Sequence, residues 1–335
     1  MNSIPVVIAG GFLGAGKTTL INHILEGDHG RRIAILVNDF GEINIDSQLI
    51  THVTGETISL ANGCVCCTIR DDLVDAVFEL TTRQPQPEYI LVETSGISEP
   101  AAAAMGIASS TKLSQKAHLD AVITVVDAEN VRKLAGNQKS LAIDQIESAH
   151  IVLLNKTDLV STAEVAAIEA WIADISPSAR IVQTHNCVVP VELILGIGNT
   201  PRNKLTLPHT HDHAHDHSTA FATWNWTGAE PLDFEAIYAF FKALPLSVFR
   251  AKGILYLREV PDKQVILQMV GPRVTLSKAA PWNDSPPRSQ IVLIGASGTI
   301  DGNELGQQIS ACTSSDDDKP PNRLADAVVE ILRRP

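Results

Sequence analysis

Residues 11–18 form a glycine-rich loop that reads Gly-Phe-Leu-Gly-Ala-Gly-Lys-Thr. Its spacing is that of the G-x-x-x-x-G-K-[ST] phosphate-binding loop, with one additional internal glycine. In such a loop backbone N–H groups curl around phosphate oxygens, and the following helix directs its N-terminal dipole at the same anion. Lys17 would reach the β- and γ-phosphates, and the Thr18 hydroxyl would bind Mg²⁺. We expect the nucleotide to contact Gly11, Gly14, Ala15, Gly16, Lys17, Thr18 and Thr19.

Residues 155–158 indicate which nucleotide binds. They read Asn-Lys-Thr-Asp and follow the apolar run 150–154. At this position the Asp158 carboxylate can accept hydrogen bonds from the N1–H and 2-amino groups of guanine, a donor pair that adenine lacks. Asn155 and Lys156 would brace the loop and cover the base. An ordinary polar loop is the plain alternative, but the place of the motif in the chain favours GTP.

A carboxylate at the end of the apolar run 89–93 is placed for chemistry at the γ-phosphate. In P-loop NTPases an acid here supports Mg²⁺ and a following glycine faces the γ-phosphate, and Glu93 and Gly96 fit these roles. The sequence shows no arginine finger and no glutamine placed to orient water. We therefore predict a hydrolase with a slow intrinsic rate.

Residues 38–42, Asn-Asp-Phe-Gly-Glu, are a third candidate near the phosphates. They follow the second predicted strand and are expected to form a switch loop that brings Glu42 or Asp46 near Mg²⁺. A solvated turn is the alternative for Asp39 and Asp46. Lys17, Glu42, Glu93 and Gly96 are the predicted catalytic groups, and Thr18, Glu42 and Glu93 the predicted Mg²⁺ ligands.

Three of the five cysteines in the chain fall within four positions, at Cys64, Cys66 and Cys67. Cysteines this close can hardly bridge one another without strain, so a shared soft metal suits them better. Zn²⁺ would take three thiolates and need a fourth ligand from water, a carboxylate or a partner. A helix predicted just after the cluster would favour the thiolate form. Three buried small side chains are the alternative.

Five of the eleven histidines alternate strictly between residues 209 and 217. Alternate side chains of an extended chain share one face, and imidazole suits Zn²⁺, Ni²⁺, Co²⁺ and Cu²⁺. We predict an exposed, weakly selective metal collector, with a polar linker as the alternative. Its ligands would be His209, His211, His213, His215 and His217.

The elements that must position these residues follow from the alternation of strand-like and helical runs before residue 205. Repeated strand–helix alternation, with strands apolar on both faces, predicts a doubly wound, mostly parallel α/β sheet of the P-loop NTPase class. Ser161 or Thr162 would cap the last helix. The expected strands are 6–10, 32–37, 89–93, 121–126, 150–154 and 180–183, and the expected helices are 17–26, 69–82, 130–148 and 162–175.

Composition changes near residue 205. We predict a P-loop domain over 1–205, a histidine-rich linker over 206–220, a smaller C-terminal α+β domain over 221–312, and an acidic, proline-containing spacer with a terminal helix over 313–335. One helix beside several neighbouring strands indicates an antiparallel sheet. The expected C-terminal strands are 221–226, 253–260, 264–270, 274–277 and 290–294, and the expected helices are 233–244, 302–312 and 323–333.

Length and charge exclude several classes of function. A chain of 335 residues corresponds to roughly two domains. No run reaches the roughly 18 apolar residues of a membrane span, so no membrane partner is expected. The net charge of −12 disfavours nucleic-acid binding. The N-terminus lacks a basic signal-peptide region, which favours the cytoplasm.

With these motifs the chain resembles the CobW-type family of metal-chaperone GTPases, which includes zinc-regulated metalloprotein activators. The C-x-C-C motif at 64–67 combined with the P-loop is highly specific, and the resemblance covers residues 5 to about 312. Position 39 is Asp where relatives usually have Glu. Further matching segments are 38–42 with Asp46, 93–96, 155–158, 250–253, 268–271 and 291–295.

The resemblance implies GTP-dependent delivery of Zn²⁺ or Co²⁺ to a client metalloprotein, with the metal held at Cys64, Cys66 and Cys67. The expected cofactors are GTP and Mg²⁺, and a homodimer is one assembly we consider. Since the cysteines lie between the switch candidate and Glu93, GTP would set the thiolate geometry and hydrolysis would release the metal. Cobalt handling in cobalamin synthesis, a metal buffer with little GTPase activity, and a small-molecule kinase are the alternatives.

Overall fold

The computed structural model describes residues 3–27, 29–37, 57–59, 68–196, 221–282, 286–299 and 301–313. The chain divides into two compact units, residues 1–195 and 196–335. The predicted linker over 206–220 and the segment 314–335 lie outside the described residues, so the predicted domain boundaries stay a prediction.

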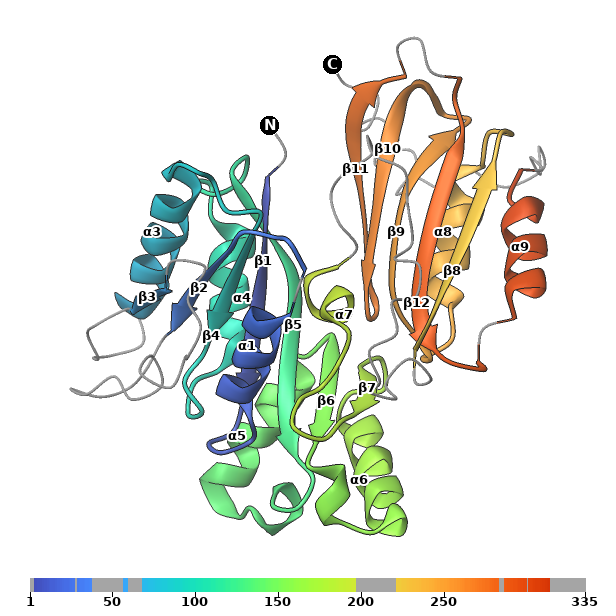
Figure 1. Cartoon of the computed structure of the whole chain (residues 1–335). Helices are drawn as coiled ribbons and strands as arrows, with labels where there is room; N and C mark the ends of the chain where they lie inside the picture. Colours follow the sequence, from blue (N-terminus) through green and yellow to red (C-terminus); the bar gives the residue numbers. More distant parts are fainter. Residues whose placement is uncertain are drawn as a thin grey trace. The chain divides into compact units, whose positions relative to one another are not determined.

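The first unit is built on a seven-stranded sheet in the order β3-β2-β4-β1-β5-β6-β7 (Figure 1). Each pair of neighbouring strands is parallel. The central strands are buried along almost their whole length, as expected for strands covered on both faces. The strands are β1 (Ile4–Gly11), β2 (Ile33–Val37), β3 (Thr57–Ser59), β4 (Tyr89–Glu93), β5 (Ala117–Asp127), β6 (Ile151–Asn155) and β7 (Arg180–Gln183).

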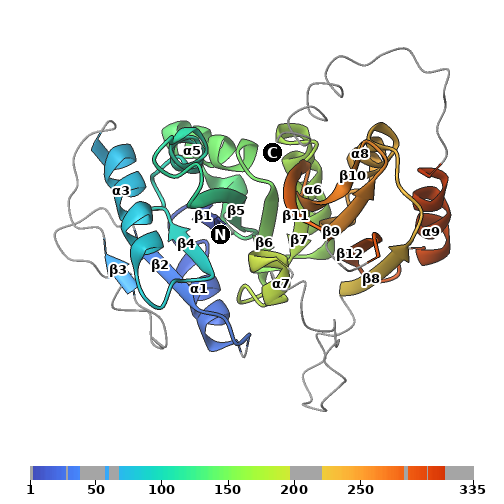
Figure 2. The ribbon, with the colours of Figure 1, turned by 90° about the horizontal axis from the view of Figure 1, so that it is seen from above.

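Helices cover both faces of this sheet, so the doubly wound α/β architecture predicted from the sequence is confirmed. Buried side chains of α3 and α4 pack on β1 and β4, and those of α5 and α6 pack on β5 and β6. Figure 2 shows α1 and α7 on the opposite side of the sheet from α5. The helices are α1 (Lys17–Glu26), α3 (Thr68–Thr82), α4 (Pro100–Ser109), α5 (Gly136–Glu147), α6 (Thr162–Ile175) and α7 (Val191–Leu195), with short 3-10 turns η1 (Val131–Lys133) and η2 (Thr157–Leu159).

The parallel register brings the carboxyl ends of four strands together. Ala9 pairs with Glu93 across β1 and β4, and Asp127 pairs with Asn155 across β5 and β6. The loops after these strands therefore meet at one edge of the sheet, where ligands bind in open α/β folds.

The second unit is an antiparallel sheet of five strands in the order β11-β10-β9-β12-β8. Helices α8 (Phe234–Ala243) and α9 (Gly302–Ala311) share one apolar core with it, so the predicted α+β arrangement is also confirmed. Asp233 begins α8 by accepting a hydrogen bond from the Ala236 N–H. The strands are β8 (Phe221–Gly228), β9 (Val248–Leu257), β10 (Val260–Val270), β11 (Arg273–Pro281) and β12 (Ser289–Ala296).

Several local elements differ from the sequence-based expectation. The strand predicted over 253–260 is interrupted by a turn, because β9 ends at Leu257 and β10 begins at Val260. The helix predicted over 130–148 is two pieces, η1 and α5, and Gly136 at the start of α5 lies in the left-handed region at φ 53°. The sequence reasoning missed α4, although Pro100 stands at its first position, where proline is favoured.

Within the ranges described above, no helix is both long and apolar enough to cross a membrane.

Candidate nucleotide site

The phosphate-binding loop joins β1 to α1, as predicted. Gly16 precedes α1 with φ 116°, and its position carries no side-chain cap. The N–H groups in the first turn of a helix have no intrahelical acceptor, so they are suited to an anion. Lys17 is 7% exposed, and its ammonium donates to the carbonyls of Gly11 at 3.0 Å and Phe12 at 3.3 Å. The lysine thus folds back over the loop that it is predicted to serve.

Thr18 and Glu93, the two described residues predicted to bind Mg²⁺, are in contact. The Thr18 hydroxyl donates to Glu93 Oε1 at 3.3 Å, and Glu93 is 2% exposed at the end of β4. A hydroxyl and a carboxylate are hard oxygen donors of the kind that Mg²⁺ takes alongside phosphate oxygens. The pair therefore fits the predicted cation.

The loop after Glu93 packs directly on the phosphate loop. A Cβ atom at Gly96 would lie 2.7 Å from the backbone nitrogen of Leu13, so only glycine permits this approach. Gln145 of α5 holds the same loop, because its side-chain amide donates to the carbonyls of Gly96 at 3.3 Å and Ser98 at 2.9 Å. Gln145 is 1% exposed.

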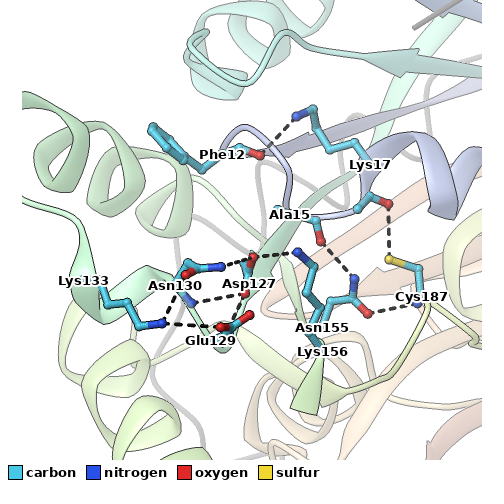
Figure 3. A network of polar contacts seen from close by, with 11 residues as sticks. Phe12, Ala15, Lys17, Asp127, Glu129, Asn130, Lys133, Asn155, Lys156 and Cys187 are labelled. Atoms are coloured by element: carbon cyan, nitrogen blue, oxygen red, sulfur yellow. Dashed lines mark hydrogen bonds and ion pairs between the residues drawn. The ribbon is translucent and has the colours of Figure 1, made fainter. Parts of the chain in front are cut away.

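Asn155 links the loop predicted to read the base to the loop predicted to hold the phosphates (Figure 3). Its amide donates to the Ala15 carbonyl at 2.9 Å, and its Oδ1 accepts from the Cys187 N–H at 3.0 Å. The thiol of Cys187 donates to the Gly16 carbonyl at 3.3 Å. One side chain therefore connects three segments that lie far apart in the sequence.

Cys187 lies in a turn with unusual backbone geometry. Asn186 and Cys187 both have positive φ, at 50° and 54°, which is uncommon for residues other than glycine. The thiol is fully buried. Burial raises its pKa to about 12, and the charge of Lys156 offsets this only in part. The thiol is therefore neutral at ordinary pH and acts as a donor, not as a thiolate ligand.

Lys156 and Asp158 complete the predicted base-reading loop. Lys156 has φ 62° and donates its ammonium to Asp127 Oδ2 at 2.7 Å. Asp158 lies in η2 with an exposed side chain. The predicted guanine acceptor is thus open to solvent beside an anchored lysine.

Each of the two units matches a known protein family. Residues 5–183 match the family "CobW/HypB/UreG, nucleotide-binding domain". The chain belongs to this family. Residues 221–313 match the "Cobalamin synthesis protein cobW C-terminal domain". The resemblance stated from the sequence is confirmed.

Two relatives of the chain have names that refer to zinc. "Zinc-regulated GTPase metalloprotein activator 1" of Dictyostelium discoideum is 37% identical over 231 residues, 58% of this chain and 48% of that protein. "Zinc chaperone YjiA" of Escherichia coli is 30% identical over 309 residues, 88% of this chain and 95% of that protein. The match thus spans about half of the Dictyostelium protein. A structure of "Zn(II)-bound YjiA GTPase" covers 93% of this chain and 99% of that chain at 26% identity, with a TM-score of 0.46.

Several predicted site residues lie outside the described part of the chain. They are Asp39, Glu42, Asp46, Cys64, Cys66, Cys67, His209, His211, His213, His215 and His217. Among the described residues no cluster of three or more His, Cys, Asp or Glu side chains is arranged to hold a metal ion. The predicted metal roles of these residues therefore stay predictions.

Sequence reasoning missed three residues that the structure brings to the site. Gln145 had a readable signal, since it is a polar residue three positions from Ala142 on the buried face of α5. Asp127 had a weaker one, an acid that ends an apolar strand as Glu93 does. Cys187 had none, because its contacts with Asn155 and Gly16 span 32 and 171 residues.

Proposed function

We propose that this chain is a GTP-hydrolysing metallochaperone that binds Zn²⁺ at Cys64, Cys66 and Cys67 and delivers it to a client metalloprotein. The observation that carries the proposal is one continuous site, in which Asn155 bonds to the phosphate loop and Thr18 bonds to Glu93. Membership of the CobW/HypB/UreG family and the names of the relatives support it.

Nucleotide binding divides between two sets of groups. The N–H groups of residues 14–18 and the Lys17 ammonium would hold the phosphates, and Asp158 would accept from guanine N1–H and the 2-amino group. Asn155 would keep these two parts in register through its bond to Ala15. Pre-arranged donors of this kind need little reorganisation when the ligand binds.

Hydrolysis would transfer the γ-phosphoryl group of GTP to water, giving GDP and phosphate. The Thr18 hydroxyl and the Glu93 carboxylate would hold Mg²⁺, which neutralises charge on the phosphates when bound. Lys17 would stabilise charge on the γ-phosphate, and the Gly96 loop would face it. In the described part of the chain, Gln145 donates to Gly96 and Ser98 and so serves the loop rather than a water molecule. A kcat of about 10 s⁻¹ without any partner would contradict the expected slow rate.

Coupling of metal to nucleotide follows from the order of the chain. The cysteine motif stands in the segment between β2 and α3, and Glu42 stands earlier in the same segment. A switch loop that responds to the γ-phosphate through Glu42 would change the thiolate geometry downstream. GTP would thus favour metal retention, and hydrolysis would favour transfer to the client.

Base specificity tests the nucleotide half of the proposal. Asp158→Asn replaces an acceptor carboxylate with an amide, so GTP should bind at least about tenfold more weakly. Xanthine carries a 2-oxo group in place of the 2-amino group, so XTP binding should improve in the same variant. The measurement is the Kd of GTP, ATP and XTP for both proteins. Equal wild-type affinity for ATP and GTP would overturn the assignment.

Metal stoichiometry tests the cargo half. The Cys64→Ser, Cys66→Ser and Cys67→Ser triple variant should lose the tightest Zn²⁺ equivalent in a competition titration with a chelating indicator. Cys312→Ser is the matched control, because Cys312 is a buried thiol in the second unit. A triple variant with wild-type Zn²⁺ affinity would refute the site, and the histidine tract would become the alternative. Deleting 209–217 should remove only weak equivalents.

Cobalt is the second candidate cargo, because the C-terminal match is described as a cobalamin synthesis domain and thiolates accept both metals. Competition of Co²⁺ against Zn²⁺ with GTP present decides between them.

A homodimer and a cytoplasmic location remain part of the proposal, to be tested by sedimentation and by fractionation of the source cells.

A further inference from the structure

Asp127 and Lys156 form an ion pair at the edge of the nucleotide site. Asp127 ends β5, and Lys156 follows the end of β6 directly. The Lys156 ammonium lies 2.7 Å from Asp127 Oδ2, and the side chains of Lys156 and Asp127 are 31% and 11% exposed. The pair therefore joins the base-reading loop to the neighbouring strand.

The carboxylate of Asp127 is itself held from several directions (Figure 3). Its Oδ1 accepts from the N–H groups of Glu129 at 2.9 Å and Asn130 at 3.2 Å, and its Oδ2 accepts from the Asn130 side-chain amide at 3.0 Å. Burial alone would raise the pKa of Asp127, but the hydrogen bonds from Lys156 and Asn130 and the lysine charge hold that pKa below its ordinary value. The acceptor is thus both fixed in position and ionised at ordinary pH.

The anchored lysine lies next to the phosphate loop. Lys156, Asp127 and Asn130 line one cavity with Phe12 and Gly14, and its volume is about 250 Å³. Lys156 has a left-handed backbone conformation, at φ 62°, directly after the end of β6. The lysine therefore borders the same cavity as the tip of the phosphate loop and stands two residues before Asp158 in the chain, so a nucleotide held by both would bring its nucleoside close to Lys156.

We propose that Asp127 is a positioning residue, which holds Lys156 ready for the guanosine part of GTP or GDP. This inference rests on the proposed function of the site. A free lysine side chain loses rotamer entropy when a ligand fixes it, and a lysine that is already anchored loses less. Because the effect concerns the nucleoside and not the γ-phosphate, it should act equally on GTP and GDP.

The test compares Asp127→Asn with Glu129→Gln. Asn keeps an acceptor for the loop N–H groups but removes the charge that holds Lys156. We expect the Kd of both GTP and GDP to rise about fivefold, with KM for GTP raised and kcat unchanged. Glu129 stands two residues after Asp127 and forms an exposed ion pair with Lys133 at 3.5 Å. Glu129→Gln removes that ion pair and should change neither Kd.

A double-mutant cycle distinguishes positioning from general support of the fold. Lys156→Met keeps the apolar stem and removes the ammonium. If Asp127 acts only through Lys156, Asp127→Asn should weaken binding no further in the Lys156→Met background. Additive losses, or a fall in kcat at unchanged KM, would overturn the inference.

Each outcome has a separate meaning. Wild-type protein that binds no guanine nucleotide would overturn the proposed function itself. Guanine-selective wild type with an Asp127→Asn variant of equal affinity would overturn only the role of Asp127. Should that variant fail to fold, Asn130→Ala removes one hydrogen bond to Asp127 and should weaken GTP and GDP binding by an equal, smaller factor. Unequal factors for the two nucleotides would contradict the inference.

Discussion

The proposed phosphate side and the proposed base side of the nucleotide site are built in different ways. The proposed phosphate side is a contiguous loop, residues 11–18, in which Lys17 folds back to donate to the carbonyls of Gly11 and Phe12. The proposed base side joins Asn155 to Cys187 and Lys156 to Asp127, through side-chain bonds between segments far apart in the chain. A local backbone feature leaves a pattern in the sequence, whereas a side-chain network does so only in part.

The largest expected effect tests the phosphate side. Lys17→Ala removes the cation that would stabilise charge on the γ-phosphate, so kcat should fall about 10²- to 10³-fold. Steady-state phosphate release measures it. Lys139→Ala, at an exposed position of α5, is the control and should keep the wild-type rate. If Lys17→Ala hydrolyses GTP at the wild-type rate, Lys17 and its loop do not take part in hydrolysis.

Gly16→Ala tests the point where the two sides meet. A Cβ atom there would lie 2.5 Å from Asn155 Nδ2 and 3.0 Å from Cys187 Sγ, at φ 116°. We expect a loss of about 3 kcal/mol in the free energy of unfolding. Gly30→Ala is the matched control, since Gly30 has φ 61° and no atom within 4 Å of the place that an added methyl group would take. It should cost about 1 kcal/mol by urea unfolding. Equal costs for the two variants would mean that the close approach is unimportant.

Asn155→Ala tests the bridge from the base side. It leaves the Cys187 N–H and the Ala15 carbonyl without this partner, which should cost about 1–3 kcal/mol in unfolding free energy and weaken GTP binding as well. Gln183→Ala is the control. Gln183 lies on the neighbouring strand β7, and its side chain makes an exposed hydrogen bond to Glu169. Its loss should change the free energy of unfolding by less than about 0.5 kcal/mol. A stable Asn155→Ala protein with wild-type GTP affinity would break the proposed link between the two sides.

The smallest expected effect concerns Cys187 and pH. Because the folded protein raises the pKa of this thiol from 9.0 to about 12, folding favours the protonated form. The stabilisation is fully present below pH 9 and is lost as pH rises towards 12. Between these values wild type should lose up to about 1.4 kcal/mol per pH unit relative to Cys187→Ser, whose hydroxyl does not ionise there.

Urea unfolding of wild type and Cys187→Ser at about pH 8, 9 and 10 gives the difference directly, since the other titrating groups are common to both proteins. A difference that stays constant across these pH values would show that the thiol is not held neutral.

The fold was largely predictable because its strands alternate with helices and are short and apolar. The sheet class and the place of the phosphate loop follow from local patterns, and so do Thr18 and Glu93, the two described residues predicted to bind Mg²⁺, which the structure brings into contact. The three-residue strand β3 and the alanine-rich α4 lack such a pattern, since β3 is too short and α4 has little apolar periodicity. Cys187 could not be predicted, because a single cysteine becomes meaningful only when folding places it against Gly16.

The most direct test of the account is a Zn²⁺ competition titration of the full chain in two nucleotide states, with GDP and with a non-hydrolysable GTP analogue, both with Mg²⁺. A GTPase that carries metal must couple the two sites, and a coupling of about tenfold or more in Zn²⁺ Kd is expected, with tighter binding in the GTP state. Equal Zn²⁺ affinity in the two states would contradict the account, because the bound nucleotide would then have no effect on metal binding.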